Sequence, residues 1–415
     1  MSSLLDIFDQ LIPSSPGGDG AAQMEFGVGW IFTIIIVIAL NLYIAWHYIA
    51  AKWSKHRRAK IIICAAIHIA LMLPSFLYWA NFFGGHSSLS YMKDLAYYAG
   101  YYLCIFFYSA GVFFIWDIIR LVRRLIRRIK NKAPLPRYAG AKLFNRFGAF
   151  YSSRITVVLL LVCAVFAACA YYAPQHIVTT NYNITIDRRD CKLDHLKAVM
   201  ISDTHIGPAI REKQIKEITE RIMAEEPDII FLAGDIFDEG TPDFLKEYTS
   251  EQFSQLYATY GVYFILGNHD DYKGDTDAVL DYFTRAGIKC LRDDVVLTGG
   301  SFYVIGREDH PDRRDELAML ETIVTEDLPV ILLDHRPVTD ESSESGNIQL
   351  QVSGHTHDGQ IYPAHWFDPA GITHSYGHYK EGQSQIIVSS GAGEFGVPMR
   401  LGSRAEIVVI DITLT

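Results

Sequence analysis

Residues 196–205, which read Leu-Lys-Ala-Val-Met-Ile-Ser-Asp-Thr-His, decide how the second half of this chain is expected to fold. The apolar run from Leu196 to Ser202 predicts a buried β-strand, and Asp203 and His205 follow it at once. In an extended chain residues i and i+2 point the same way, so both side chains are expected to face one place. A carboxylate and an imidazole placed in this way can both coordinate a metal ion, but an isolated Asp-x-His is more often a turn or a helix cap.

Four further segments repeat this arrangement of an apolar run followed by metal-binding side chains. They are Gly234-Asp235, Gly267-Asn268-His269-Asp270, Asp334-His335-Arg336 and Gly354-His355-Thr356-His357. The carboxylate, imidazole and amide groups, without a thiolate, suit Mn, Fe or Zn with open coordination rather than a closed structural zinc site. They are too many for one catalytic ion, but they suit two ions that share a bridging carboxylate. Two such ions hold a phosphate and activate water, so we expect phosphoester hydrolysis.

Short apolar runs alternate with amphipathic helical patterns across this half of the chain. Strands are expected at 196–202, 228–233, 262–266, 295–296, 302–305, 330–333, 349–352, 386–389 and 406–412, and helices at 212–224, 244–259 and 275–286. The alternation predicts an α/β layered domain over residues 184–415. The acidic run from Glu308 to Glu316 is expected to be a solvated face.

The first part of the chain contains four long stretches without a charged residue. They are Phe26–Ala51, Ile61–Tyr91, Leu95–Trp116 and Ile155–Ala173. A helix needs about 20 residues to cross a bilayer, so residues 26–173 are predicted to form a bundle of four transmembrane helices rather than buried helices of a soluble protein. Residues 1–25 contain no Lys or Arg, which favours a retained first helix over a cleaved signal peptide.

The charge of the chain divides sharply at Ala173. Up to that residue 17 Lys and Arg face 6 Asp and Glu, a balance of +11, whereas the remainder has 20 against 41, a balance of −21. The loops 52–60 and 117–154 are basic and are therefore predicted to be cytoplasmic. The N-terminal segment 1–25 and the domain 184–415 are then extracytoplasmic, in a multi-pass cell-membrane protein. Membrane lipids are the expected partners, and the acidic domain disfavours nucleic acid.

The five metal-binding segments, in this order, resemble those of the calcineurin-like metallophosphoesterases. The resemblance covers roughly residues 184–413. Two closing segments, 354–361 and 388–393, are similar to a subgroup of membrane-anchored bacterial phosphodiesterases and their animal transmembrane relatives. The resemblance implies a four-layer αββα sandwich of two β-sheets flanked by helices, with the active site at the strand ends.

The resemblance also implies a role for each position. The first metal would be held by Asp203, His205, Asp235 and His357. The second metal would be held by Asp235, as the bridge, with Asn268, His335 and His355. His269 would contact the phosphate and protonate the leaving group, and Asp270 would orient His269. Arg336 and Asp358 depart from the subgroup's pattern. Arg336 is either a phosphate contact or a surface ion pair, and Arg400 is a predicted substrate contact.

We therefore expect a membrane-bound hydrolase that cleaves a phosphodiester or a pyrophosphate with two divalent metal ions, of which manganese is the first choice. A lipid-linked or envelope substrate at or near the bilayer suits the predicted anchor. The alternatives are a phosphomonoesterase and a non-enzymatic envelope protein that binds a phosphorylated ligand. Cys191 and Cys290, in the outer domain, either stay free or form a disulfide. The sequence makes no prediction of the oligomeric state.

Overall fold

The computed structural model describes residues 92–130 and 153–415, with gaps at 208–209, 239–240, 271–275, 311–312, 326, 339, 363–373 and 397. It also describes residues 72–77 and a few positions between residues 41 and 70. The chain separates into two compact units. One comprises Met1–Gly84 with Tyr101–Ala167, and the other comprises Gly85–Gly100 with Ala168–Thr415.

The described residues before the β-sheets are helical. Helix α4 spans Met92–Lys130 and helix α6 spans Ser153–Tyr172. The basic segment that was predicted to connect the third and fourth spans from residue 117 is helical as far as Lys130. Among the described residues, no helix combines the length and the apolar character that crossing a bilayer requires. The predicted segment 1–25 and most of the first two predicted spans lie outside the described residues, so the four-helix bundle stays a prediction.

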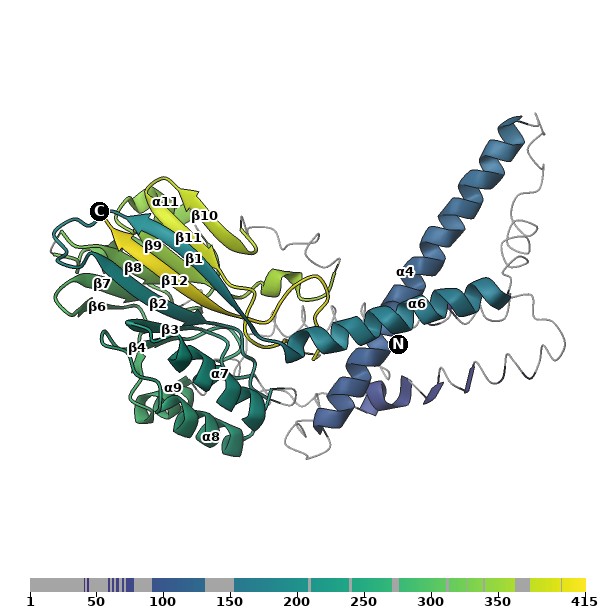
Figure 1. Cartoon of the computed structure of the whole chain (residues 1–415), viewed down its shortest axis with the longest axis horizontal. Helices are drawn as coiled ribbons and strands as arrows, with labels where there is room; N and C mark the ends of the chain where they lie inside the picture. Colours follow the sequence, from purple (N-terminus) through teal and green to yellow (C-terminus); the bar gives the residue numbers. More distant parts are fainter. Residues whose placement is uncertain are drawn as a thin grey trace, which may run out of the picture. The chain divides into compact units, whose positions relative to one another are not determined.

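Two six-stranded β-sheets form the second half of the chain (Figure 1). The first sheet has the strand order β1-β12-β2-β3-β4-β5. Its strands are β1 (Val178–Ile186), β12 (Glu406–Leu414), β2 (His195–Ile201), β3 (Ile229–Ala233), β4 (Val262–Ile265) and β5 (Lys289–Cys290). Strands β2 to β5 are parallel, so their carboxyl ends lie at one edge of the sheet. Strand β12 is antiparallel to β2 and parallel to β1.

The second sheet has the strand order β10-β11-β9-β8-β7-β6. Its strands are β10 (Gly377–Glu381), β11 (Ser384–Val388), β9 (Leu350–Ser353), β8 (Val330–Leu333), β7 (Phe302–Gly306) and β6 (Asp294–Thr298). The four inner strands are parallel, and the two edge strands run antiparallel to their neighbours. The parallel inner strands again place their carboxyl ends together.

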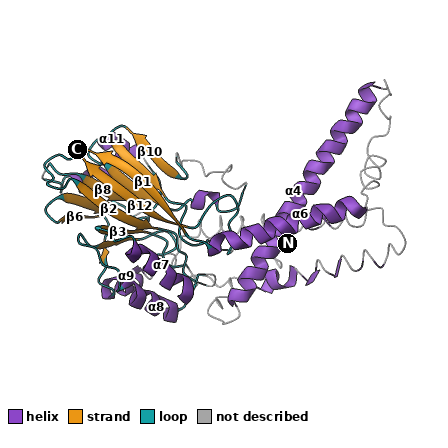
Figure 2. Ribbon diagram, in the orientation of Figure 1, coloured by secondary structure: helices purple, strands orange, loops and turns teal. Residues whose placement is uncertain are grey.

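Three amphipathic helices cover one face of the first sheet. They are α7 (Glu212–Ala224), α8 (Asp243–Phe253) and α9 (Thr276–Arg285), and Figure 2 shows them gathered on one side of the strands. In α7 the spacing of Ile215, Ile218 and Ile222 puts all three side chains on one face, and all are fully buried. Burying each of them stabilises the fold by about 1.5–3 kcal/mol relative to exposure.

The hydrophobic core lies in two layers, because successive residues of a strand point to opposite faces. In β2, Met200 belongs to the layer between the two sheets, with Phe231 and Leu332. Its neighbours Val199 and Ile201 belong to the layer beneath the helices. These two layers confirm the predicted α/β sandwich.

Two shorter helices, α10 (Leu317–Glu321) and α11 (Asp340–Ser345), follow β7 and β8, and α11 packs beside β9 and β11. Buried polar contacts hold α11 there: Ser384 Oγ donates to Ser342 O at 3.0 Å, and Ser342 Oγ to Gln351 Oε1 at 2.5 Å. Two short 3₁₀ helices, η1 (Ala173–Gln175) and η2 (His357–Gly359), complete the described elements.

Candidate metal centre

The predicted metal-binding residues all follow the carboxyl ends of parallel strands. The loops after β2, β3, β4, β8 and β9 carry, in that order, Asp203 with His205, Asp235, Asn268 with His269, His335, and His355 with His357. Strands β2, β3 and β4 are neighbours in one sheet, and β8 and β9 are neighbours in the other. The sandwich therefore collects side chains from five distant segments at one edge.

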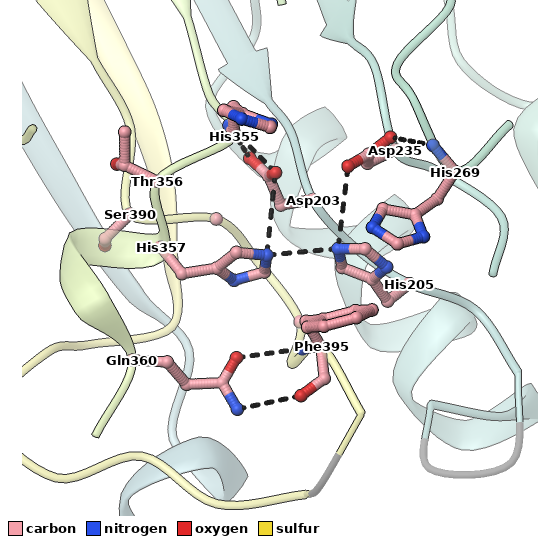
Figure 3. Close-up of polar contacts among 12 residues, drawn as sticks. Asp203, His205, Asp235, His269, His355, Thr356, His357, Gln360, Ser390 and Phe395 are labelled. Carbon is pink, nitrogen blue, oxygen red and sulfur yellow. Dashed lines mark hydrogen bonds and ion pairs between the residues drawn. The ribbon is translucent and has the colours of Figure 1, made fainter. Parts of the chain in front are cut away.

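The first cluster comprises Asp203, His205 and His357, whose ligand atoms all lie within 4.8 Å of one another. His357 Nε2 lies 3.6 Å from Asp203 Oδ1 and 3.0 Å from His205 Nε2 (Figure 3). Asp235 Oδ2 lies 3.8 Å from His205 Nε2. The structure thus brings together the four residues that were predicted for the first metal.

The second cluster comprises Asp235, His335 and His355, again with ligand atoms within 4.8 Å of one another. Asp235 Oδ2 lies 3.1 Å from His335 Nε2, so this one oxygen lies near imidazoles of both clusters. That is the place of a bridging carboxylate. The other oxygen, Oδ1, accepts the backbone N–H of His269 at 2.8 Å, which fixes the carboxylate group.

Five of these residues have a backbone conformation that side chains other than glycine rarely adopt. Their φ angles are 49° for Asp203, 43° for His205, 53° for Asp235, 72° for His355 and 52° for His357. Each such residue costs of order 1–3 kcal/mol unless the surrounding structure holds it, and this kind of strain collects at functional sites. The left-handed turns redirect the chain so that the side chains point at one another.

Two glycines leave room for the carboxylates of the clusters. A Cβ atom at Gly354 would lie 2.2 Å from Asp203 Oδ2, and one at Gly267 would lie 2.1 Å from Asp235 Oδ1. The backbone N–H of His355 donates to both oxygens of Asp203, at 2.9 and 3.1 Å. The glycine neighbours noted in the sequence are therefore needed for the close packing of ligand and backbone.

The two buried carboxyl groups of the site, those of Asp203 and Asp235, need positive charge nearby to stay ionised. Burial raises the pKa of Asp203 above its ordinary value. Burial also acts to raise the pKa of Asp235, but the positive charges of His335 and His205 outweigh it and hold that pKa far below the usual range. In return, Asp235 raises the pKa of His335 well above its ordinary value although burial opposes this. A proton on His335 thus supplies charge that a metal ion would otherwise supply.

Two further imidazoles of the site, those of His355 and His357, favour the neutral form. Burial, followed by the positive charges of His335 and Arg336, lowers the pKa of His355 to about 4. Burial, followed by the charge of His205, lowers the pKa of His357 well below its ordinary value. Metal ions bind the neutral form of imidazole, so both residues are ready to coordinate at neutral pH.

Buried polar atoms without a hydrogen-bond partner also gather here. They include His205 Nδ1 and Asn268 Oδ1. Leaving a buried polar group unsatisfied costs about 1–3 kcal/mol, so two such atoms in one site indicate a ligand that the protein chain does not supply. Each is a nitrogen or oxygen ligand atom of the kind that Mn, Fe or Zn accepts. The residues present therefore fit two divalent metal ions.

His269 lies beside both clusters, as predicted, but its carboxylate neighbour differs from the prediction. Asp238 Oδ1 lies 4.0 Å from His269 Nδ1 and 3.8 Å from His205 Nδ1. The carboxylate of Asp270 instead accepts two backbone N–H groups, that of Gly267 at 3.0 Å and that of Phe237 at 2.9 Å. Asp270 therefore ties the loop after β4 to the loop after β3, and Asp238 is the acid placed to orient His269.

The two predicted substrate arginines have different environments. Arg336 Nε donates to Asp309 Oδ1 at 2.8 Å and Arg336 Nη2 donates to Asp309 Oδ2 at 2.9 Å. The side chain of Arg336 is 36% exposed. Arg400 is fully buried, and Nη2 donates to Ser390 O at 2.7 Å and lies 3.4 Å from His357 Nδ1. The prediction for Arg400 is therefore wrong, because its side chain holds loop carbonyls beneath the site instead of reaching a substrate.

Several features of the site were missed from the sequence. Asp238 lies three residues after Asp235, in the pattern Gly-Asp-x-x-Asp, and this spacing is a signal that could have identified it. Glu308 and Asp309, expected on a solvated face, are 1% and 5% exposed because arginines pair with them. No local signal marked Phe395, whose ring centroid lies 4.6 Å from that of His269.

Comparison with known proteins agrees with this geometry. A family model described as calcineurin-like phosphoesterase matches residues 196–359. An uncharacterized metallophosphoesterase of Aquifex aeolicus is 30% identical over 52% of this chain and 85% of its own length. The chain belongs to the calcineurin-like metallophosphoesterase family. The two clusters around Asp235 agree with the two metal sites that the resemblance of the sequence motifs implies.

Two further metallophosphoesterase relatives differ in how far they match. One from Helicobacter pylori is 32% identical over 53% of this chain, which spans 61% of that relative's length. A "transmembrane protein with metallophosphoesterase domain" of Danio rerio is 25% identical over 75% of this chain and 77% of its own length. The second match therefore extends beyond the residues of the family model.

The two cysteines of the α/β domain are free thiols in the structure. Cys191 is buried and Cys290 is partly buried, and neither forms a disulfide. Burial raises the pKa of the Cys290 thiol to about 11.

Proposed function

We propose that this metallophosphoesterase hydrolyses a phosphodiester, or the related pyrophosphate linkage, with two divalent metal ions at the clusters around Asp235. The observation that carries the proposal is the position of Asp235 Oδ2, 3.1 Å from His335 and 3.8 Å from His205. One carboxylate oxygen that faces both clusters is what a pair of ions about 3.5–4 Å apart requires. When bound, the ions would supply Lewis-acid activation of the phosphate and of the attacking water.

The residues around the ions account for the remaining chemistry. Water attacks phosphorus and gives up one proton to solvent, the bond from phosphorus to the leaving oxygen breaks, and the leaving oxygen takes the electron pair and one proton. His269, beside both clusters and next to Asp238, is placed to donate that proton. Its backbone N–H donates to Asp235 at 2.8 Å, so the main chain that carries the ring is held next to the proposed bridging carboxylate. General-acid assistance of this kind contributes about 10²–10⁴ in rate.

A diester is favoured over a monoester by the charge of the site. A phosphomonoester dianion would gain most from an additional free cation, because charge-assisted contacts are the strong ones. Arg336 already binds both oxygens of Asp309, and Arg400 is fully buried among carbonyl groups. Neither arginine is therefore free to bind a phosphomonoester dianion. The substrate test below distinguishes a phosphodiesterase from a phosphomonoesterase.

We also propose that residues 26–173 anchor the chain in a membrane, with the catalytic domain extracytoplasmic. The support is the four uncharged stretches and the basic loops of the sequence. The Danio rerio relative is named as a transmembrane protein and matches three quarters of this chain. A substrate at the bilayer, such as a lipid-linked or envelope phosphodiester, follows from the anchor, and membrane lipids are the proposed partners. The balance of −21 after residue 173 disfavours nucleic acid as the substrate.

Manganese is the proposed metal, with iron and zinc as the alternatives, because imidazole, carboxylate and amide ligands without thiolate suit these ions. The test uses detergent-purified full-length protein loaded with Mn²⁺, with bis-p-nitrophenyl phosphate and p-nitrophenyl phosphate as substrates. We expect diester cleavage to exceed monoester cleavage. Asp235→Asn and His269→Ala should each lose at least about a hundredfold in kcat/KM. His195→Ala, an exposed histidine at the start of β2, is the matched control and should behave as wild type.

Each result separates one reading from another. Preferential monoester cleavage would show a phosphomonoesterase, and two bound metal ions without cleavage of either ester would favour a non-enzymatic ligand-binding protein. Sidedness is tested separately by labelling intact cells with an impermeant maleimide, in a Cys169→Ser background. Ser254→Cys, exposed after α8, should be labelled, whereas Arg123→Cys in α4 should be labelled only after lysis. The opposite pattern would overturn the proposed orientation.

A further inference from the structure

Phe395 is an exposed aromatic side chain at the metal centre. It lies in the loop between β11 and β12, and 45% of it is exposed. Its ring centroid lies 4.6 Å from that of His269 and 5.3 Å from that of His205 (Figure 3). The ring thus contacts the proposed general acid and a ligand of the first metal, while much of its surface remains open.

The backbone of Phe395 is held by a single side chain. Gln360 Oε1 accepts the N–H of Phe395 at 2.9 Å, and Gln360 Nε2 donates to Phe395 O at 3.1 Å (Figure 3). Gln360 is itself fixed, because its backbone N–H donates to the carbonyl of the metal ligand His357 at 2.9 Å. The position of the aromatic ring is therefore tied to the position of the metal site.

The loop that carries Phe395 packs tightly against the turn after β2. A Cβ atom at Gly393 would lie 1.9 Å from the carbonyl oxygen of Thr204, and the N–H of Gly393 donates to Asp203 O at 2.9 Å. Buried Arg400 donates to Gly393 O as well. A loop with these contacts presents the Phe395 ring in one place, so a ligand that stacks on it loses little entropy to loop ordering.

We propose that Phe395 determines substrate specificity by stacking against a flat or apolar organic group on the leaving-group side of the scissile phosphate. The proposal rests on the proposed function, because it assigns the leaving-group side from His269. Stacking of a planar group on an aromatic side chain strengthens binding enough that a preference of about tenfold is expected, which corresponds to about 1.4 kcal/mol.

The test measures binding rather than turnover. Phenylphosphonate and methylphosphonate are titrated by calorimetry into Mn²⁺-loaded full-length protein, and the ratio of their dissociation constants is the readout. Wild type should bind phenylphosphonate about tenfold more tightly than methylphosphonate. Phe395→Ala should reduce this ratio to about one, and Phe395→Trp should keep it. Tyr257→Ala, an aromatic residue that is 73% exposed elsewhere in the domain, is the matched control and should keep the wild-type ratio.

Gln360→Ala tests how the ring is positioned. We expect two metal ions per chain to remain bound and the phenyl preference to fall, because Phe395 is no longer fixed beside His269. A purely structural role for Gln360 would instead weaken both phosphonates equally and would not change the ratio.

The proposal is overturned if wild type shows no phenyl preference, or if Phe395→Ala retains it. Its failure is distinguishable from that of the proposed function. A protein that prefers phenylphosphonate but cleaves no ester would refute hydrolysis and leave the role of Phe395 standing. A protein that cleaves diesters but binds both phosphonates equally would support hydrolysis and refute the role of Phe395.

Discussion

Replacement of Arg400 by methionine tests the interpretation that this residue supports the metal centre from below. Methionine keeps most of the apolar stem and removes every donor. Four carbonyl groups then lose their guanidinium donor; those of His357 and Gly391 keep a backbone N–H donor, whereas those of Ser390 and Gly393 lose the donor that Arg400 supplied. Each unsatisfied group costs about 1–3 kcal/mol, so the loss is about 4 kcal/mol in total. For a domain of this size 1 kcal/mol shifts Tm by about 2–4 °C, which predicts a decrease of about 8–16 °C.

The assay is thermal unfolding of the full-length protein in detergent, followed by circular dichroism. Arg221→Met is the matched control, because Arg221 only pairs with Glu217 along the exposed face of α7, with Nε 3.0 Å from Oε1. Such a pair contributes about 0.3–0.5 kcal/mol, so a decrease of about 2 °C or less is expected. If Arg400→Met unfolded within about 3 °C of wild type, Arg400 would not hold the loop, and its role would have to be sought at the substrate.

Three further outcomes follow from the site and its surroundings. Gly267→Ala should lower the metal content from two ions per chain to one or none, measured by plasma mass spectrometry, because the new Cβ would lie 2.1 Å from Asp235 Oδ1; Gly111→Ala, with open space at its Cβ, should not. Chelation with EDTA should lower Tm by about 5–11 °C, since saturation at a hundred times Kd stabilises by about 2.7 kcal/mol, and Asp203→Asn should show a smaller difference between loaded and chelated forms. Cys290, whose pKa burial raises to about 11, should be alkylated by iodoacetamide at pH 8 about a hundredfold more slowly than an ordinary thiol, and labelling should accelerate up to about pH 11; a rate that already levels off near pH 9 would contradict the raised pKa.

The sequence predicted most strands and the ligand set because both depend on local pattern. The helix at 212–224 has the predicted bounds, and the ligands follow apolar strands in a fixed order. Strand β1 was missed, because the segment from Val178 was interpreted as the connection to the preceding helix, although its Val, Thr, Tyr and Ile residues are typical of a strand. Its pairing partner, Glu406–Leu414, is distant in sequence, so only the folded chain shows that β1 is an edge strand.

Charge and exposure were harder to predict than strand position. Arg400 and Asp309 are ordinary surface residues by type, and their burial depends on partners that only the folded chain assembles. The acid that faces His269 was also hard to predict. Asp270 lies next to His269 in the sequence, whereas Asp238 lies close to it only in space. Sequence spacing assigned the orienting role to the neighbour along the chain, whereas the turn after β3 gives it to the other acid.

The position of β12 between β1 and β2 has a consequence for how the protein is made. The ribosome synthesises β1 and β2 long before residues 406–414, so the strand between β1 and β2 is missing from the first sheet until these residues emerge. A premature stop codon before Glu406 would remove an inner strand and separate β1 from the rest of the sheet. The same geometry makes the segment a natural split point: a peptide of residues 406–414 added to a chain that ends at residue 405 would have a ready-made slot with a strand on each side.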